Sequence, residues 1–505
     1  MRAVPSWHPI HRPAAALGLV ALALHLFANG GYDYFRDELY FIACGNHLAW
    51  GYVDQPPLVP LIARLSRLAF GNSLAGFRLV PALAAAGLAA LTAEAAGRLG
   101  GGLFARWLAG IAILAAPTFV IDGLPLTTDT LQPIAWLAIT LAMMAALDRG
   151  RPRAWLAAGA LAGLAMLDKY MVAFFLLAAL VGLAATRQRR ALAHPAPWLG
   201  VALVLLIPLP NLLWQQAHGW PFFELGAAAA GGKNVAYGPL AYFGEEIRML
   251  NPMIAPIWLS GIAWFALWRP ARRWIAIAWF VLMALMVLVH GKPYYPVGIY
   301  PILLAGGGVA LEAALKPRWA RAGALAAVTG TGLILLPLGL PILPVDRFIA
   351  YEQTLGILPE SAEINRVGVL PQYYADMFGW RELAAAVGTA FQALPPEDRA
   401  RAVFIGRNYG EAAAIDFYGA PWHLPPAISG HNNYFLWGPD GHDGSVVLRV
   451  GSTRDTLLES YGSVEAVGRI EHPYAMPYES GITLWLCRDR KISLTTDWSG
   501  FKHYD

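Results

Sequence analysis

Charged side chains are scarce in this sequence. Only 14% of its 505 residues are Asp, Glu, Lys or Arg, whereas soluble proteins usually carry about 25%. Hydrophobic residues make up 57% of the chain, and the mean hydropathy is +0.47. This composition excludes an ordinary soluble protein and predicts an integral membrane protein. The net charge is only +4, and the basic residues form short clusters between apolar runs, so nothing predicts a nucleic-acid partner.

Cysteine is nearly absent as well, with only Cys44 and Cys487 in the chain. Two cysteines exclude a disulfide framework and a cysteine-based zinc site. Both lie on the predicted outer side of the membrane, so a single bridge between them stays open, but the sequence favours two separate buried thiols.

Long apolar runs are the dominant feature that is present. A helix that crosses a bilayer needs roughly 17 to 25 mostly apolar residues. The sequence predicts about eleven such helices, at 13–30, 74–97, 103–121, 127–147, 154–168, 170–185, 196–213, 253–268, 274–289, 296–315 and 320–343. The first run follows Arg2 and Arg12 as in a signal peptide, but no small-x-small cleavage site follows it, so we expect an uncleaved first helix.

The loop charges predict an orientation. Cytoplasmic loops are enriched in Lys and Arg, and an N-terminus inside places every dense basic cluster of the membrane half inside. These clusters are Arg98 and Arg106; Arg149, Arg151 and Arg153; Arg187, Arg189 and Arg190; Arg269, Arg272 and Arg273; and Lys316, Arg318 and Arg321. The outside loops then receive mainly carboxylates, namely Asp33, Asp37, Glu38, Asp54, Asp122, Asp129, Glu224, Glu245 and Glu246.

The composition changes from about Val345 onward. Charged and turn residues increase, and helix-like "WRELAAAVGTAFQAL" precedes strand-like "RAVFIG", "GSVVLRVG" and "GITLWLC". This pattern predicts a soluble α/β or α+β domain at 345–505, which an odd number of spans places outside. The preceding 1–344 form the predicted transmembrane domain, with its first outer loop at 31–73.

That first outer loop concentrates charge in a chain that otherwise avoids it. It contains "RDELYFIACGNHLAWGYVDQPPLVPLI", from Arg36 to Ile62. Helical spacing of its apolar residues predicts amphipathic helices in the membrane interface. Pro56 and Pro57 end one helix and fix the next turn. By itself, an acidic pair at a helix start is often only a solvated cap.

The loop and several other segments carry a family resemblance. They are "DELYFIACGNHLAWGYVDQPPL", "PNLLWQ", "HGKPYY", "NYGEAAAIDFYG", "ISGHNNYFLWGP" and "HPYAMPYES". Together they resemble the dolichyl-phosphate-mannose protein mannosyltransferase superfamily of GT-C fold. The likeness is strongest to the bacterial glycosyltransferase family 39, relatives of the lipid A aminoarabinose transferases. The family's His-Pro-Pro-like motif has Gln55 in place of His here.

The resemblance implies transfer of a sugar from a polyprenyl-phosphate donor to a lipid, glycan or protein acceptor on the outer, periplasmic side of a bacterial inner membrane. A positioned carboxylate can take the proton of the attacking hydroxyl. Asp37 matches the family's catalytic base. Glu38 is then expected to orient it, bind the acceptor or help hold a cation. One base and in-line displacement would invert the anomeric configuration.

The leaving lipid phosphate gains negative charge and needs fixed cations. The predicted outer loops offer Arg36, Lys169, Lys233, Arg248 and Lys292. Of these, Arg36, Lys169 and Lys292 are the candidates for donor binding, with Tyr294 and Tyr295 beside Lys292. Two simpler explanations stay open: Lys292 as a snorkelling lysine in an aromatic belt, and Lys169 as the partner of Asp168.

Four further residues are candidates for lining the cavity. They are Asp54, Gln55, Asp129 and His290. Asp129 equally suits a helix cap together with Thr127 and Thr128, and Asp54 suits a turn. The sequence predicts no certain cofactor, although a cluster of Asp37, Glu38, Asp54 and Asp129 would suit a divalent cation.

Two other classes of function compete with the enzyme. One is a transporter or flippase for a lipid-linked saccharide, and the other is a non-catalytic partner in envelope assembly. Transporters often show inverted repeats and helices broken at mid-membrane. The sequence shows neither, and its carboxylates cluster at the predicted outer edge, which favours the transferase.

Overall fold

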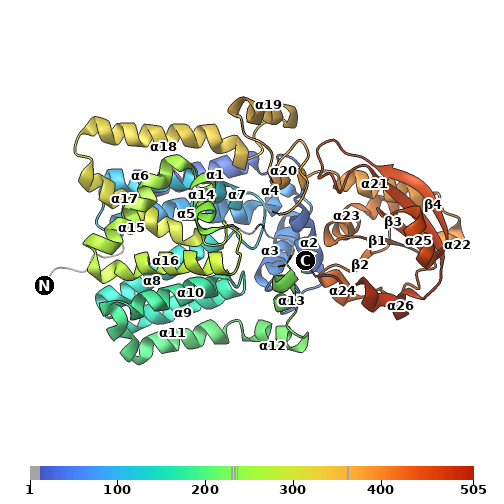
Figure 1. The fold of residues 1–505 in the computed structure, drawn as a ribbon, viewed down its shortest axis with the longest axis horizontal. Coiled ribbons are helices and arrows are strands. Elements are labelled where there is room, and N and C mark those ends of the chain that lie inside the picture. Colours follow the sequence, from blue (N-terminus) through green and yellow to red (C-terminus); the bar gives the residue numbers. More distant parts are fainter. Residues whose placement is uncertain (1–11, 229–230, 232–234, 236, 361–362, 505) are drawn as a thin grey trace. The chain divides into compact units, whose positions relative to one another are not determined.

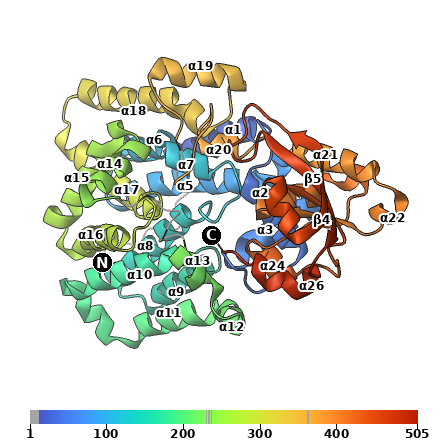
Figure 2. The same ribbon diagram turned by 45° about the vertical axis from the view of Figure 1, so that its right-hand side comes forward.

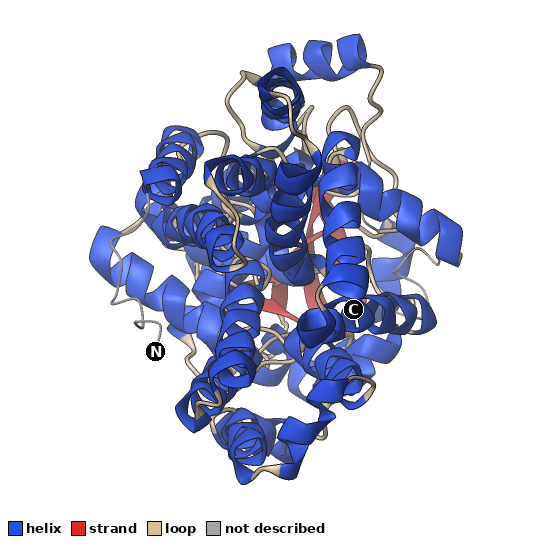
Figure 3. Cartoon of the chain, turned by 90° about the vertical axis from the view of Figure 1, so that its left-hand side faces the viewer, coloured by secondary structure: helices blue, strands red, loops and turns tan. Residues whose placement is uncertain are grey.

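The computed structural model describes residues 12–228, 231, 235, 237–360 and 363–504. The chain divides into two compact units. We call Met1–Gly31, Phe70–Leu213 and Ala236–Leu343 the helical unit, and Tyr32–Ala69, Trp214–Val235 and Pro344–Asp505 the sheet unit. The chain is mostly helical, with one small sheet (Figure 3). The units do not follow a single cut in the sequence, because most of the first loop groups with the C-terminal residues.

The helical unit consists of apolar helices that pack side by side (Figure 1). Its longer elements are α1 (Arg12–Ala28), α5 (Leu79–Arg98), α6 (Leu103–Leu114), α7 (Pro117–Asp122), α8 (Gln132–Arg149), α9 (Pro152–Met166), α10 (Met171–Ala184), α11 (Pro195–Leu206), α14 (Pro239–Met249), α15 (Ala255–Ala263), α16 (Arg273–Leu288), α17 (Tyr300–Ala314) and α18 (Arg318–Gly339). Helix α1 packs on α5, α8 on α9, α9 on α11, and α10 on α16. Helix α12 (Leu209–Ala217) crosses the division between the units.

Small residues let some of these helices approach closely. Helices α15 and α17 pack against each other. A Cβ atom on Gly261 would collide with the backbone of Leu303, and one on Gly307 would collide with that of Ile257. Close backbone approach at small residues is typical of helix pairs in membranes, where packing has to replace the hydrophobic effect.

Four helical segments are long and apolar enough to cross a bilayer: Leu79–Arg98, Pro270–Leu288, Val297–Ala314 and Arg318–Gly339. Three bent helix pairs raise the number to as many as seven within the described residues. The first predicted span is the 17-residue helix α1. The fold is therefore that of a polytopic helical protein, as its composition predicts.

The sheet unit contains a five-stranded sheet of order β2-β1-β3-β5-β4. Its strands are β1 (Ala402–Gly406), β2 (Ile428–Ser429), β3 (Val446–Val450), β4 (Tyr461–Ile470) and β5 (Ile482–Arg490). Strand β1 runs parallel to β2 and β3, whereas β5 runs antiparallel to β3 and β4. This mixed sheet with adjoining helices confirms the predicted α/β or α+β region. All five residues of β1 are buried, as expected for a strand with neighbours on both sides.

The helices of the sheet unit include two in the first loop, where the sequence predicts amphipathic helices. They are α2 (Arg36–Asn46), α3 (Leu58–Phe70), α13 (Pro221–Ala228), α19 (Val345–Leu355), α20 (Gln372–Ala375), α21 (Trp380–Gln392), α22 (Pro396–Arg399), α23 (Tyr409–Tyr418), α24 (Asn433–Trp437), α25 (Arg454–Ser460) and α26 (Leu494–Asp497). Helix α2 packs on α23, and α23 packs on β1 (Figure 1). Figure 2 shows α2 and α3 beside elements of the C-terminal residues. The first loop thus lies against the C-terminal residues. Cys44 and Cys487 are both free and buried, which agrees with separate thiols.

Candidate active site

Asp37 lies in the first turn of α2, and its two carboxylate oxygens differ in their surroundings. Oδ1 accepts a hydrogen bond from the Tyr409 hydroxyl at 2.8 Å and one from the Arg36 Nε at 3.3 Å. Oδ2 has no hydrogen-bond partner among the described residues, and the side chain is 28% exposed. One oxygen is therefore held, while the other is open to an incoming group.

Local structure fixes the two donors to Asp37. Asn408 caps α23 by accepting the backbone N–H of Glu411 at 3.0 Å, which makes Tyr409 the first residue of that helix. The ring of Tyr40, one turn along α2 from Asp37, stacks on the Tyr409 ring with centroids 4.4 Å apart. Stacked aromatic pairs of this kind contribute about 0.5–1.5 kcal/mol beyond the area they bury.

The Arg36 guanidinium is held by groups from the C-terminal residues. Its Nη1 donates to the Tyr478 hydroxyl at 3.2 Å and lies 3.7 Å from Asp376 Oδ2. Burial raises the pKa of Asp376 to about 6, although the neighbouring Arg36 opposes this shift. Arg36, the predicted phosphate ligand, is thus already paired with carboxylates, and a phosphate would have to compete with them.

Glu38 is fully buried. Its Oε2 accepts the backbone N–H of Phe35 at 2.9 Å, so the carboxylate satisfies a backbone donor at the start of α2. Such a bond is half of a capping box. Because the carboxylate is buried, an acceptor sugar cannot reach it. Of the three roles expected for Glu38, the arrangement therefore suits the one that orients Asp37.

The Asp-Gln-Pro-Pro segment is held by residues of the first loop and by one C-terminal residue. Asp54 accepts hydrogen bonds from the Tyr40 hydroxyl at Oδ1 (3.0 Å) and from Asn432 at Oδ2 (3.4 Å). Gln55 is buried and donates to the Cys44 sulfur at 3.7 Å. Where the family has an imidazole, this chain therefore has an amide packed among buried groups.

In the helical unit, Lys169 pairs with Asp129. The ammonium lies 2.6 Å and 2.7 Å from the two carboxylate oxygens, and both side chains are mostly buried. It also lies 4.8 Å from the Tyr295 ring centroid and 5.7 Å from that of Tyr294. Two open alternatives are thereby decided. The partner of Lys169 is Asp129 rather than Asp168, because Asp168 accepts a hydrogen bond from Gln132 at 2.6 Å. Asp129 does not cap α8.

Lys292 and His290 lie in the segment between α16 and α17. The Lys292 ammonium is 5.9 Å from the Tyr294 ring centroid, and its carbonyl accepts from the Tyr242 hydroxyl at 3.2 Å. Tyr294 is therefore shared by Lys169 and Lys292 within the helical unit. His290 has a positive φ of 50° and ends the turn after α16. The fifth predicted cation, Lys233, lies outside the described residues.

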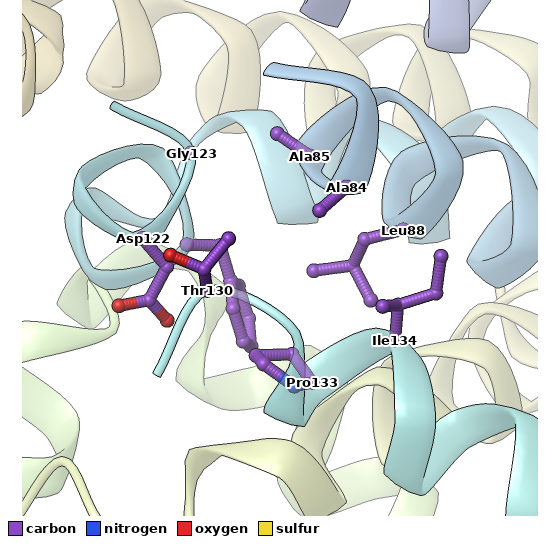
Figure 4. A pocket seen from close by; sticks show the side chains of 9 residues that line it. Ala84, Ala85, Leu88, Asp122, Gly123, Thr130, Pro133 and Ile134 are labelled. Carbon is purple, nitrogen blue, oxygen red and sulfur yellow. The ribbon is translucent and has the colours of Figure 1, made fainter. Parts of the chain in front are cut away.

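A small pocket lies between α5, α7 and the start of α8 (Figure 4), and none of the predicted site residues lines it. Its lining is mostly apolar, with Asp122 and Thr130 as the polar members. The Oδ2 atom of Asp122 is buried without a hydrogen-bond partner among the described residues. Because polar groups orient a sugar in its site, this apolar pocket is a poor candidate for one.

A divalent-cation site is not assembled by the described residues, among which no three His, Cys, Asp or Glu side chains form a suitable group. The predicted carboxylates are engaged with other partners: Asp37 with Tyr409, Asp54 with Tyr40, and Asp129 with Lys169. Asp37, Glu38, Asp54, Gln55 and Arg36 belong to the sheet unit, and Asp129, Lys169, His290, Lys292, Tyr294 and Tyr295 belong to the helical unit.

Sequence reasoning did not single out Tyr409, Tyr478 or Asp376, which surround Arg36 and Asp37. Tyr409 and Tyr478 do lie in the segments "NYGEAAAIDFYG" and "HPYAMPYES" that carry the family resemblance. Their position in these segments could therefore have identified the two tyrosines from the sequence. Aromatic hydroxyls inside such segments are candidates for contacts with the loop that carries the base.

Comparisons with known proteins find one family model that matches part of the chain and solved structures of similar fold. Residues 54–214 match the family described as dolichyl-phosphate-mannose-protein mannosyltransferase. The solved structure of ArnT from Cupriavidus metallidurans bound to undecaprenyl phosphate is similar to this chain, with a TM-score of 0.58 and 18% identity over 94% of this chain and 97% of that one. ArnT from the same organism in the apo state gives a TM-score of 0.57 and 16% identity over the same shares.

A search of curated proteins finds no match. The structural likeness, at under one-quarter identity, concerns the fold, and the family match covers the end of the first loop and the helices that follow it. The family match over 54–214 and the fold that this chain shares with ArnT agree with the resemblance that the sequence carries.

Proposed function

We propose that this protein is an inverting glycosyltransferase that moves a sugar from a polyprenyl-phosphate donor to an acceptor hydroxyl on the periplasmic face of the bacterial inner membrane. The acceptor is a glycolipid, polysaccharide or protein of the cell envelope. The observation that carries the proposal is the half-open carboxylate of Asp37. Its Oδ1 is held by Tyr409 and Arg36, and its side chain is 28% exposed.

Asp37 is the proposed base. As the acceptor oxygen attacks the anomeric carbon, Asp37 Oδ2 takes the hydroxyl proton. The bond between the anomeric carbon and the phosphate oxygen breaks, and its electron pair leaves with the polyprenyl phosphate. A single displacement of this kind inverts the anomeric centre. Glu38 supports the base indirectly by fixing the first turn of α2.

Lys169 and Lys292 are the proposed phosphate ligands, and Tyr294 and Tyr295 shape their surroundings. An ammonium group has three N–H donors, so Lys169 can keep a bond to Asp129 and still donate to a phosphate oxygen. Charge-assisted bonds of this type stabilise the charge that develops on the leaving group. Arg36 is proposed as a secondary ligand because two carboxylates already engage it. The remaining candidates for lining the site are Asp54, Gln55, Asp129 and His290.

The proposal also includes about eleven membrane spans, an N-terminus inside and a periplasmic sheet unit. Exposed positions allow a direct test of the orientation. Glu471 is 66% exposed in the sheet unit, and Arg269 is exposed between α15 and α16. In intact cells, a membrane-impermeant maleimide should label Glu471→Cys but not Arg269→Cys. The reverse pattern would reject the periplasmic assignment.

The activity is tested with purified protein, a panel of polyprenyl-phosphate pentoses and hexoses, and acceptor lipids from a deletion strain. Wild-type protein should release polyprenyl phosphate and form a glycosylated product. Asp37→Asn should lower kcat by about 100- to 10,000-fold, the range that general-base catalysis supplies. Near-normal turnover of this variant would reject Asp37 as the base. Transport of the lipid-linked sugar without product would favour the flippase instead.

A further inference from the structure

A tyrosine from the C-terminal residues contacts the proposed base. Tyr409 and Asp37 are 372 positions apart in the sequence, yet the Tyr409 hydroxyl donates to Asp37 Oδ1 at 2.8 Å. We propose that Tyr409 is a positioning residue, which holds the Asp37 carboxylate so that Oδ2 faces the acceptor. The inference rests on the proposed function. It makes the C-terminal residues part of the catalytic machinery rather than a docking module.

The geometry around Tyr409 is rigid. Asn408 caps α23 and accepts the N–H of Glu411, and this fixes the first turn, to which Tyr409 belongs. The Tyr409 side chain is 7% exposed and stacks on Tyr40. The Arg36 guanidinium carbon lies 5.5 Å from the Tyr409 ring centroid. The Tyr40 ring and the Arg36 guanidinium thus hold the phenol in the position from which its hydroxyl donates to Asp37 Oδ1.

The protonation state of Tyr409 fits the positioning role. Burial raises the pKa of Tyr409 well above its ordinary value, and Asp37 adds to the shift while Arg36 opposes it. The phenol therefore stays protonated and acts as a donor rather than as a competing base. The charged and titratable groups that face Asp37 are Arg36 on its own helix, Tyr409 on α23 and Asp376 at the end of α20.

A preorganised base needs one orientation, because proton transfer depends on geometry first. Oδ1 already accepts hydrogen bonds from two donors. A rotation of the carboxylate that turns Oδ2 toward Tyr409 would therefore add no hydrogen bond. Without the phenolic O–H, only the longer Arg36 bond of 3.3 Å remains. The carboxylate then samples other rotations, and its ionised form loses a donor.

The chain contains a matched control for this contact. Tyr418 lies at the other end of the same helix, and its hydroxyl donates to Asp33 Oδ1 at 2.7 Å. Tyr418→Phe removes the same atom and the same kind of bond to a carboxylate of the first loop. It leaves the contact with Asp37 intact. A loss that reflects only weaker attachment of the loop should affect both variants equally.

The test compares Tyr409→Phe, Tyr418→Phe and Asp37→Asn in steady-state transfer, with rates expressed per folded protein. Loss of a hydrogen bond to a charged group predicts a fall in kcat of about 10- to 100-fold for Tyr409→Phe. Its donor KM should stay within about twofold, because the bond acts on the chemical step. Tyr418→Phe should keep kcat within about twofold. The acidic limb of the pH–rate profile should move to higher pH for Tyr409→Phe alone.

Replacing Tyr409 by 4-aminophenylalanine keeps the ring and an N–H donor, so it should recover part of the lost kcat. The Asp37→Asn/Tyr409→Phe double variant should be no slower than Asp37→Asn, because Tyr409 acts through Asp37. Equal kcat values for Tyr409→Phe and Tyr418→Phe, or no recovery with the amino analogue, would overturn the inference. An active Asp37→Asn would instead overturn the proposed function itself.

Discussion

The network around Arg407 provides a stability prediction that is independent of catalysis. Arg407 Nε donates to Glu411 Oε1 at 2.7 Å, and its Nη2 lies 3.0 Å from Glu479 Oε2. Asn408 donates to the other Glu479 oxygen at 2.8 Å. The Glu411 side chain is 0% and that of Glu479 6% exposed, whereas that of Arg407 is 29% exposed. One guanidinium thus serves two buried carboxylates.

Arg407→Met removes this shared partner. Removing one member of a buried ion pair typically costs about 3–5 kcal/mol, because the remaining charge is left buried and uncompensated. For a domain of 150–250 residues, 1 kcal/mol corresponds to roughly 2–4 °C in the midpoint of thermal unfolding. We therefore expect the unfolding midpoint of the sheet unit to fall by at least about 6 °C.

The two native thiols provide the assay. Cys44 and Cys487 are buried and free, and both belong to the sheet unit. Their reaction with a fluorogenic maleimide during heating reports unfolding of this unit without an engineered probe. Arg469→Met is the matched control. Its ion pair with Glu471 is exposed on both sides, so we expect a change of less than about 1 kcal/mol.

The pH dependence of the unfolding midpoint provides a second test. Burial raises the pKa of Glu479, and the neighbouring Glu411 adds to the shift while Arg407 opposes it. Without Arg407, the pair should take up a proton more readily, so acidification should recover part of the lost stability. The double variant Arg407→Met/Glu479→Gln should recover part of the lost stability at all pH values, because its amide carries no charge. Equal midpoints for Arg407→Met and Arg469→Met would refute the reasoning.

Three further predictions follow from other contacts. Burial raises the pKa of Asp416 to about 6, above its unfolded value of about 3.9. The folded state therefore loses stability as the pH rises through about 6, and Asp416→Asn should remove this part of the pH dependence of thermal unfolding. Lys169→Met should raise the donor KM at least about tenfold by removing a charge-assisted phosphate contact, and an unchanged KM would exclude Lys169 from the donor site. Gly261→Ala should lower thermal stability, because its Cβ would meet the backbone of Leu303, whereas Gly244→Ala, with open space around its Cβ, should be neutral in the same unfolding assay.

Much of the fold could be predicted because strong local patterns determine it. The apolar runs "RAVFIG", "GSVVLRVG" and "GITLWLC" correspond to β1, β3 and β5. Strand β4 was missed because it is an edge strand with mostly exposed side chains and two glycines, so it lacks an apolar run. Strand β2 has only two residues, too few to leave a sequence signal.

The surroundings of the site were less predictable, because they depend on contacts between distant residues. Asp37 was identified through the resemblance to a family, but its contact with Tyr409 requires the packing of α2 on α23. The sequence left open whether Lys169 pairs with Asp168. Neighbouring residues point in different directions, and Asp168 turns to Gln132 while Lys169 reaches Asp129 across 40 positions.

The contacts of the four predicted carboxylates differ in a way that bears on which one acts as base. Both oxygens of Asp129 lie against the Lys169 ammonium, both oxygens of Asp54 accept hydrogen bonds, and Glu38 is buried. Proton transfer from an acceptor sugar to any of these three would weaken an existing contact or require the sugar to reach a buried group, which adds to the barrier. Asp37 can accept the proton while its contacts with Tyr409 and Arg36 stay in place. A base that needs no rearrangement has the lower barrier, and this difference supports the proposal that Asp37 is the base.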